Sequence, residues 1–235
     1  MLPTYQERAN IEPFLRAVRA AADVDVLVVD DNSPDGTGAA AEEVGEEIGG
    51  IDVLHRPEKA GLGSAYREGF DHALGDGYDV ILSMDADFSH DPAILPDFLA
   101  AIDAGADAVI GSRYVPGGEV VDWPPHRRLL SRWGNAYTRG VLRISAHDCT
   151  SGYRAYRSDT LKAIDPGSTT AEGYAFLTEL ARRLTRQGAR IEEIPITFRD
   201  RVRGKSKMSP RVISESMLLV TRWGLSDAWA ARRRC

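Results

Sequence analysis

The sequence of 235 residues has only two cysteines, Cys149 and Cys235, too few for a disulfide-stabilised scaffold, and this scarcity fits a reducing compartment. Long apolar runs are also absent, because Arg222 and Asp227 interrupt the most apolar late segment, 217–231. The first residues show no basic stretch followed by an apolar one, so we expect no secretory signal there. We therefore expect a cytoplasmic protein that can still lie on the surface of a membrane.

An excess of positive charge is absent too. Lys and Arg number 29 and Asp and Glu number 35, which gives a net charge of −6. This balance argues against a general nucleic-acid binder, and we expect no nucleic-acid partner. The contents of 43% hydrophobic and 27% charged residues are typical of a globular protein, and the length suits a single domain, with at most a short appendage.

The first half of the sequence alternates between β-branched apolar runs and amphipathic segments. The runs predict strands at 24–31, 51–55, 79–84 and 106–111, and the segments between them predict helices at 37–48, 61–74 and 92–102. This alternation indicates an α/β fold with a mostly parallel sheet that helices cover on both faces. Only two residues precede Pro3, so either the first strand is two or three residues long or the chain is truncated.

The second half is less regular. Its patterns predict helices at 127–142, 173–186 and 210–231, strands at 148–157 and 190–198, and a basic loop at 199–209. Polar residues gather where the strands of the first half end, and in parallel sheets ligands bind outside these carboxyl ends. The clustering is the main indication of an active site: Asp30 and Asp31, Asp85 and Asp87, and Ser112 and Arg113.

Two acidic pairs admit two interpretations each. In an extended stretch Asp85 and Asp87 would point to the same side, and a hard cation such as Mg²⁺ or Mn²⁺ would relieve their repulsion. The alternative is a solvated turn at a strand end. Asp30 and Asp31 either cap the following helix or accept hydrogen bonds from a base or ribose.

Basic groups far along the chain could complete such a site. A metal–diphosphate site needs cations that neutralise the charge of the leaving group, which Arg does in bidentate fashion and Lys as a point charge. The alternative is a solvated basic loop, which we favour for Arg203 and Lys205. The candidate cations are Arg113, Arg201, Arg203, Lys205 and Lys207.

Seven motifs carry a family resemblance. They are Pro3–Glu7, Val29–Thr37, Gly61–Gly63, Asp85–His90, Gly111–Tyr114, Thr150–Arg154 and Asp200–Lys207, and they occur in this order. Together they resemble the dolichol-phosphate (polyprenol-phosphate) mannose synthases, which are family 2 glycosyltransferases with the Rossmann-like GT-A fold. The resemblance implies a GT-A catalytic domain over residues 1–208, followed by a C-terminal amphipathic helix over 209–235.

The resemblance also implies roles for individual residues and a cofactor, Mg²⁺ or Mn²⁺. Asp87 is the surest metal ligand, Asp85 lies nearby on ribose or metal, and Arg127 or Arg128 is similar to an arginine near the acceptor phosphate. The implied catalytic residues are Asp87, Arg113, Arg201 and Lys207. The implied donor-binding residues are Pro3, Tyr5, Glu7, Val29, Asp31, Asp85, Ala86, Asp87, Ser89, Arg113, Arg201 and Lys207, and the implied metal ligands are Asp85, Asp87 and Ser89.

The implied reaction is transfer of mannose from GDP-mannose to a polyprenyl monophosphate, with inversion at C1. The acceptor oxygen is already anionic near neutral pH, so we nominate no catalytic base. The alternatives are a transferase that uses UDP-glucose or another donor, a non-catalytic nucleotide-sugar-binding subunit, and a phosphohydrolase. The helix at 210–231 would suit a membrane interface or pack on the body, and we expect a peripheral location on the cytoplasmic face, with a membrane-protein partner.

Overall fold

The computed structural model describes residues 1–200 and 210–232. Three parallel strands form one sheet in the order β1-β2-β3, namely Leu2–Thr4, Val26–Asp30 and Ile51–His55. Four strands form a second sheet in the order β4-β7-β5-β8, namely Val80–Ser83, Arg154–Arg157, Ala108–Ser112 and Ile191–Pro195. In this sheet β7 is antiparallel to β4 and β5, whereas β8 is parallel to β5. The parallel pair β6 (Glu119–Val121) and β9 (Thr197–Arg199) completes the set of strands.

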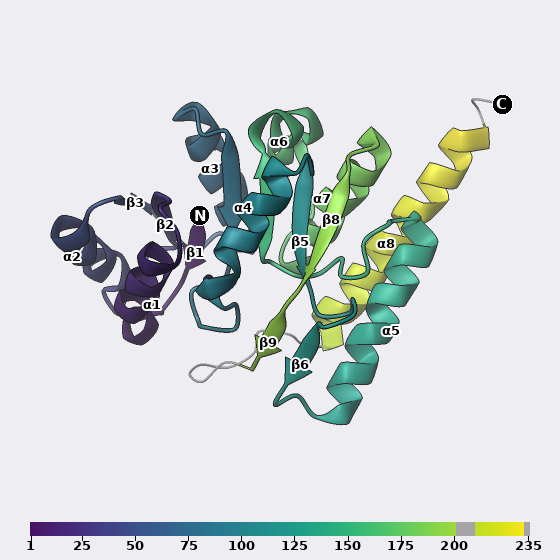
Figure 1. The fold of residues 1–235 in the computed structure, drawn as a ribbon. Helices are drawn as coiled ribbons and strands as arrows, with labels where there is room; N and C mark the ends of the chain where they lie inside the picture. Colours follow the sequence, from purple (N-terminus) through teal and green to yellow (C-terminus); the bar gives the residue numbers. More distant parts are fainter. Residues whose placement is uncertain (201–209, 233–235) are drawn as a thin grey trace.

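Helices cover the strands (Figure 1). Their bounds are α1 Arg8–Ala21, α2 Thr37–Ile48, α3 Leu62–Gly75, α4 Leu95–Asp103, α5 Pro125–Leu142, α6 Ser158–Ile164, α7 Tyr174–Gln187 and α8 Pro210–Arg232, with short 3₁₀ turns at Pro92–Ile94 and Pro166–Ser168. One core cluster joins α1, α2 and α4 to the strands, and another joins α3, α6 and α7 to them. The expected α/β fold with a mixed, mostly parallel sheet between helices is confirmed.

The predicted elements of the first half are confirmed to within two residues, apart from 92–102, which divides into the 3₁₀ turn and α4. Four elements that we did not predict are α1, β6, α6 and the 3₁₀ turn Pro166–Ser168. Pro13 lies inside α1 and makes this helix hard to predict from sequence, because proline removes one hydrogen bond of a helix. Burial of Ile11, Phe14, Leu15 and Val18 on one face compensates for this loss.

Two predicted strands of the second half are partly wrong. The segment 190–198 divides at Ile196 into β8 and β9. Of 148–157 only the last four residues form a strand, β7, because the preceding residues fold into a turn around the buried Asp148. The wholly buried Arg154 fixes that turn, since its guanidinium donates to the carbonyls of Ser151 and Cys149 at 2.7 and 2.8 Å. Hydrogen bonds from the Arg154 side chain thus take the place of strand pairing in residues 148–153.

Helix α8 lies alongside α5 (Figure 1). Its inner face is anchored by Val220, which is buried, by a 2.7 Å hydrogen bond between Thr221 and Tyr137, and by Asp227, which accepts from Arg182 at 2.8 Å. The expectation that this helix packs on the body is therefore confirmed for its inner face. None of the helices in the described ranges is both long and apolar enough to cross a membrane. The predicted domain boundary after residue 208 lies outside the described residues.

Candidate active site

The loops after β1 and β2 are tied together by Asp30. Its carboxylate accepts from the hydroxyl of Ser33 at 2.6 Å, from the Ser33 amide at 3.0 Å and from the hydroxyl of Thr4 at 3.2 Å. Asp30 is buried, and these bonds use it to hold two strand ends in register. The interpretation that Asp30 caps the following helix is therefore wrong, because Asp30 closes the turn after β2, whereas the N-cap of α2 is Gly36, with no side-chain cap hydrogen bond. Asp31 is the acid left for ligand binding.

Asp31 lies beside a cation from the next strand connection. Arg56 donates to Asp31 and, at 2.8 Å, to Glu68, and the side chain of Arg56 is only 2% exposed. Burial raises the pKa of Asp31, although the hydrogen bond from Arg56 opposes this shift. The ammonium of Lys59 lies 3.6 Å from the centre of the Tyr5 ring. A carboxylate, an aromatic ring and an ammonium thus border one edge of the site.

The acidic motif Asp85-Ala86-Asp87 lies in the loop after β4, not in the extended stretch that we predicted. Asp85 is about one-third exposed, whereas Asp87 is 4% exposed and accepts from the Ser89 amide at 3.0 Å. Phe88, between Asp87 and Ser89, has a φ of +60°, a strained value for an aromatic residue. The Phe88 ring packs edge-on against Phe14 at 5.0 Å, so a core contact supports the strained turn.

The donor set of this loop fits a divalent cation. The hydroxyl oxygen of Ser89 is buried and has no hydrogen-bond partner among the described residues, an arrangement that is costly unless a ligand uses it. No group of three or more His, Cys, Asp or Glu residues suited to a metal occurs in the described part of the chain. Asp85, Asp87 and Ser89 would therefore leave coordination positions for substrate oxygens and water, as Mg²⁺ sites commonly do.

His90 connects the acidic loop to the other half of the site. Its Nδ1 accepts from the Asp85 amide at 3.1 Å, which requires that this nitrogen carries no proton. Burial lowers the pKa of His90, and the positive charge of Arg113 acts in the same direction. The imidazole packs against Tyr153 and Phe198 at 5.2 and 5.5 Å. A neutral His90 therefore supports the loop as an acceptor.

Arg113 is held by a buried carboxylate. Its Nε and one terminal nitrogen donate to the two oxygens of Asp148 at 2.6 and 2.7 Å, and that terminal nitrogen also donates to Thr150 at 2.7 Å. Burial alone would raise the pKa of Asp148, but Arg113 outweighs it and holds that pKa below its usual range. The guanidinium also lies over the ring of Phe198 at 5.3 Å. This bidentate pair fixes the direction of the arginine.

Arg127 borders the same region from α5. Its guanidinium lies 3.9 Å from the centre of the Trp123 ring and donates to Asp200 at 2.9 Å. Arg128, the other candidate for the acceptor phosphate, is exposed. A cavity of about 110 Å³ lies between α5 and α8, and its lining includes Arg127, Trp123 and Thr150. The cavity therefore reaches from α5 and α8 to Thr150, which accepts a hydrogen bond from Arg113.

The other predicted residues fall into three groups. Val29 and Ala86 are buried in core clusters, so a role in donor binding would fall to their backbone. Pro3 pairs with β2, and Glu7 is the N-cap residue of α1 and accepts from Asn10 at 2.8 Å. Arg201 and Lys207 lie outside the described residues, as do Arg203 and Lys205.

Four neighbours of the site were not assigned a role from sequence. His90 is the last residue of the motif Asp85–His90, and Asp148 stands two positions before the motif Thr150–Arg154, so spacing could have drawn attention to both. Lys59 and Trp123 carry no local signal, because the fold alone brings them to Tyr5 and Arg113. The structure joins the acidic loop to Arg113 through two contacts of His90: its imidazole accepts from the Asp85 amide and packs on the Phe198 ring, over which the Arg113 guanidinium also lies.

Comparison with known proteins identifies the family of the chain. Residues 1–165 match the sequence profile described as glycosyl transferase family 2. The chain belongs to this family. The fold of this family 2 enzyme is similar to crystal structures of glucosyl-3-phosphoglycerate synthase from Mycobacterium tuberculosis, one of them in complex with Mn²⁺, UDP-glucose and phosphoglyceric acid. That match has a TM-score of 0.70 and 19% identity and covers 95% of this chain and 77% of the other.

Two relatives are much closer in sequence. An undecaprenyl-phosphate mannosyltransferase from Micrococcus luteus is 48% identical over 234 residues, which are 99% of this chain and 96% of the relative. A polyprenol monophosphomannose synthase from Mycolicibacterium smegmatis is 48% identical over 227 residues, which are 96% of this chain and 86% of the relative. This family 2 enzyme therefore resembles both relatives along nearly its whole length.

Proposed function

We propose that this enzyme transfers mannose from GDP-mannose to a polyprenyl monophosphate, inverts the configuration at C1 and releases GDP. The observation that carries the proposal is that His90 and Phe198 connect the loop of Asp85 and Asp87 to Arg113, in a chain 48% identical to an undecaprenyl-phosphate mannosyltransferase and to a polyprenol monophosphomannose synthase. Acids suited to a cation and an arginine suited to a phosphate thus share one site.

Each group has a role in this reaction. Asp85, Asp87 and Ser89 would hold Mg²⁺ or Mn²⁺, which when bound supplies positive charge to the diphosphate. Arg113, oriented by Asp148, adds a fixed positive charge where the leaving group becomes more negative. Asp31 and Tyr5 border the place for the nucleoside. No described residue need act as a base, because the acceptor phosphate is already anionic.

We infer that the acceptor enters along α5 and α8. The cavity between these helices leads toward Thr150 and Arg113, and an isoprenoid needs an apolar path of this kind. The two helices expose large apolar side chains, namely Leu129 and Trp133 on α5 and Leu218, Leu225 and Trp229 on α8. On α5 the exposed Arg128 and Arg132 add positive charge. This surface suits peripheral contact with the anionic cytoplasmic face of a membrane.

A transfer assay tests the proposed function. Purified chain is mixed with radiolabelled GDP-mannose, vesicles that contain a polyprenyl phosphate, and Mn²⁺ or Mg²⁺. We expect label in the lipid extract, and we expect chelation of the metal to stop its transfer. A parallel reaction with UDP-glucose tests the choice of donor, and one without lipid tests hydrolysis. Transfer from UDP-glucose in preference to GDP-mannose, or release of mannose 1-phosphate without lipid, would contradict the proposal.

A further inference from the structure

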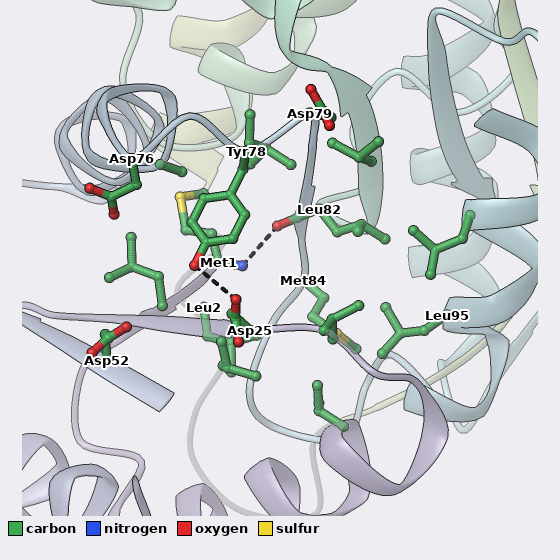
Figure 2. Close-up of a pocket in the computed structure, with 18 of the residues that line it drawn as sticks. Met1, Leu2, Asp25, Asp52, Asp76, Tyr78, Asp79, Leu82, Met84 and Leu95 are labelled. Carbon is green, nitrogen blue, oxygen red and sulfur yellow. Dashed lines mark hydrogen bonds between the residues drawn. The ribbon is translucent and has the colours of Figure 1, made fainter. Parts of the chain in front are cut away.

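The indole nitrogen of Trp123 is a buried hydrogen-bond donor that has no partner among the described residues. Donors beside another cavity of the protein do have partners. At a cavity of about 340 Å³ that borders the starts of β2 and β4, the Met1 amine donates to the Leu82 carbonyl at 2.8 Å, and Tyr78 donates to Asp25 at 3.0 Å (Figure 2). An unpaired buried donor costs free energy unless a ligand or a water uses it.

The backbone holds Trp123 in one place, in the connection from β6 to α5. Asp122 before it has a φ of +65°, in the left-handed region that aspartate tolerates better than most residues. Pro124 after it restricts Trp123 to extended conformations and is the N-cap residue of α5. The indole also packs edge-on against the ring of Phe198 at 5.5 Å. Its N–H is therefore held in advance of any ligand.

Two arginines lie beside the indole, and neither can accept its proton. The guanidinium carbon of Arg127 is 3.9 Å from the centre of the Trp123 ring, and that of Arg113 is 5.7 Å from it. Guanidinium and indole N–H groups donate hydrogen bonds but do not accept them. Asp148 and Asp200 orient the two arginines, and neither accepts from the indole. Three donor groups that cannot satisfy one another favour an anionic acceptor between them.

Trp123 also lines the cavity of about 110 Å³ between α5 and α8, the proposed path of the lipid acceptor. Arg127 and Thr150 line the same cavity, and Thr150 accepts from Arg113 at 2.7 Å. The indole thus lies where this path meets the two arginines. The anionic group that arrives there along an apolar path is the phosphate at the head of the lipid.

We propose that the indole N–H of Trp123 donates a hydrogen bond to a phosphate oxygen of the lipid acceptor, so that Trp123 binds and orients the nucleophile. This inference rests on the proposed function, because it takes the acceptor to be a phosphate monoester. Arg127 and the indole would each hold one phosphate oxygen, which leaves a third to attack. That oxygen forms the new bond to C1, and the electron pair of the broken C1–O bond leaves with GDP.

A contact between the N–H and the face of Phe198 is the alternative use of this donor. Such contacts are weak, and a guanidinium, that of Arg113, already lies over the Phe198 ring at 5.3 Å. In that case Trp123 would stabilise the fold without any effect on the affinity for phosphate. The affinity for a phosphate monoester therefore separates the two uses.

Replacement of Trp123 by phenylalanine tests the proposal. Trp123→Phe removes the N–H and keeps an aromatic ring beside Arg127. The acceptor is a water-soluble prenyl phosphate with one isoprene unit, so the lipid chain does not contribute. We expect Trp123→Phe to raise the KM for this acceptor by about tenfold or more, the loss expected for one hydrogen bond to a charged group, and to leave the KM for GDP-mannose unchanged.

Trp223→Phe is the matched control, because Trp223 packs on the body and does not line the cavity. It should leave both KM values unchanged. Titration calorimetry with the prenyl phosphate, in the absence of donor, should show the same loss of affinity for Trp123→Phe alone. Binding of GDP with Mn²⁺ and the melting temperature show whether each variant is folded.

Nuclear magnetic resonance of the parent chain gives a readout that no variant fold can disturb. The protein contains four tryptophans, so ¹⁵N labelling gives four indole signals, which single Trp→Phe replacements assign. We expect the prenyl phosphate to shift the Trp123 indole proton downfield and the corresponding alcohol, prenol, to leave it in place. Inorganic phosphate should shift it less than the prenyl phosphate does at equal concentration, because the cavity then stays empty.

Three results would overturn the proposal. The first is a folded Trp123→Phe with the parent affinity for prenyl phosphate. The second is an indole signal that responds to GDP-mannose with Mn²⁺ but not to prenyl phosphate, because the N–H would then serve the donor. The third is an equal response to inorganic phosphate and to prenyl phosphate. If the parent transfers no mannose, the proposed function fails, whereas calorimetry and the indole signal still decide whether Trp123 binds the phosphate.

Discussion

The proposed donor side and the proposed acceptor side of this enzyme are built in opposite ways. On the donor side, the loops after β1, β2 and β4 contain buried polar residues. Asp30, Asp31 and Asp87 each accept a hydrogen bond from a neighbouring residue of the fold. On the acceptor side, α5 and α8 expose large apolar side chains, among them Trp133 and Leu218. The difference suggests that the donor is oriented by fixed charges, whereas the lipid is accommodated by area and shape.

The largest expected effect concerns Asp87 on the donor side. We expect Asp87→Asn to lower mannosyl transfer by about 100-fold or more, because one negative charge for the cation is lost. Its Mn²⁺ affinity, measured by electron paramagnetic resonance, should fall in parallel. Asp97→Asn, at an exposed position of α4, is the matched control and should retain both properties. Full transfer by Asp87→Asn would remove the metal assignment.

The second prediction concerns the support of Arg113. Asp148→Asn leaves a buried guanidinium without its counter-charge, so it should lower the free energy of unfolding by about 3 kcal/mol at neutral pH and raise the KM for donor. Because the pKa of Asp148 is lowered in the folded state, its contribution is present above the ordinary value of 3.8 and is lost as the pH falls through the folded value. The difference between parent and variant should therefore shrink in acid.

Urea unfolding at several pH values measures this difference. A difference that stays constant from neutral pH into acid would mean that the Asp148 charge does not stabilise the fold. An unchanged KM for donor in the folded variant would mean that Asp148 does not position Arg113 for the diphosphate.

The third prediction concerns the acceptor side. Replacing Leu218 and Leu225 by serine removes two exposed apolar side chains of α8, so we expect about tenfold weaker binding to anionic vesicles. Transfer to a short, water-soluble acceptor should not change, because the donor side is untouched. Ser226→Ala, at a neighbouring exposed position, is the control. Equal vesicle binding by all three proteins, measured by co-sedimentation, would show that this face does not contact lipid.

The smallest effect should come from Lys59. We expect Lys59→Ala to raise the KM for donor about threefold with little change in kcat, because the contact of its ammonium with Tyr5 is a weak interaction at an exposed site. Lys59→Arg keeps a cation over the ring and should restore the parent KM. A fall in kcat without a change in KM would place Lys59 near the reacting atoms instead.

The same contrast explains how much the sequence predicted. The strands of the first half and the acids at their ends were predictable, because β-branched runs and turn residues act over a few positions. The contact between Lys59 and Tyr5 was not predictable, because the two residues are 54 positions apart and no local pattern relates them. The turn at Asp148 was not predictable either. Its centre is a buried ion pair between Asp148 and Arg113 rather than a cluster of apolar residues, and no apolar pattern marks it in the sequence.

Helix α8 shows a different limit. Its sequence supports both a packed helix and an interfacial one, and the structure places its packed and its exposed apolar residues on different faces. Met217, Val220 and Trp223 face the body, whereas Leu218 and Leu225 face outward. A composition that is amphipathic overall could not show which apolar residues the neighbouring helix α5 would cover.

The position of the metal in a ternary complex tests the central claim most directly. Crystals grown with GDP-mannose and Mn²⁺ would be measured at a wavelength where manganese scatters anomalously. We expect a peak about 2.1 Å from a carboxylate oxygen of Asp87, in contact with the diphosphate. A nucleotide bound elsewhere, or a diphosphate bound with no manganese near Asp87, would contradict the account.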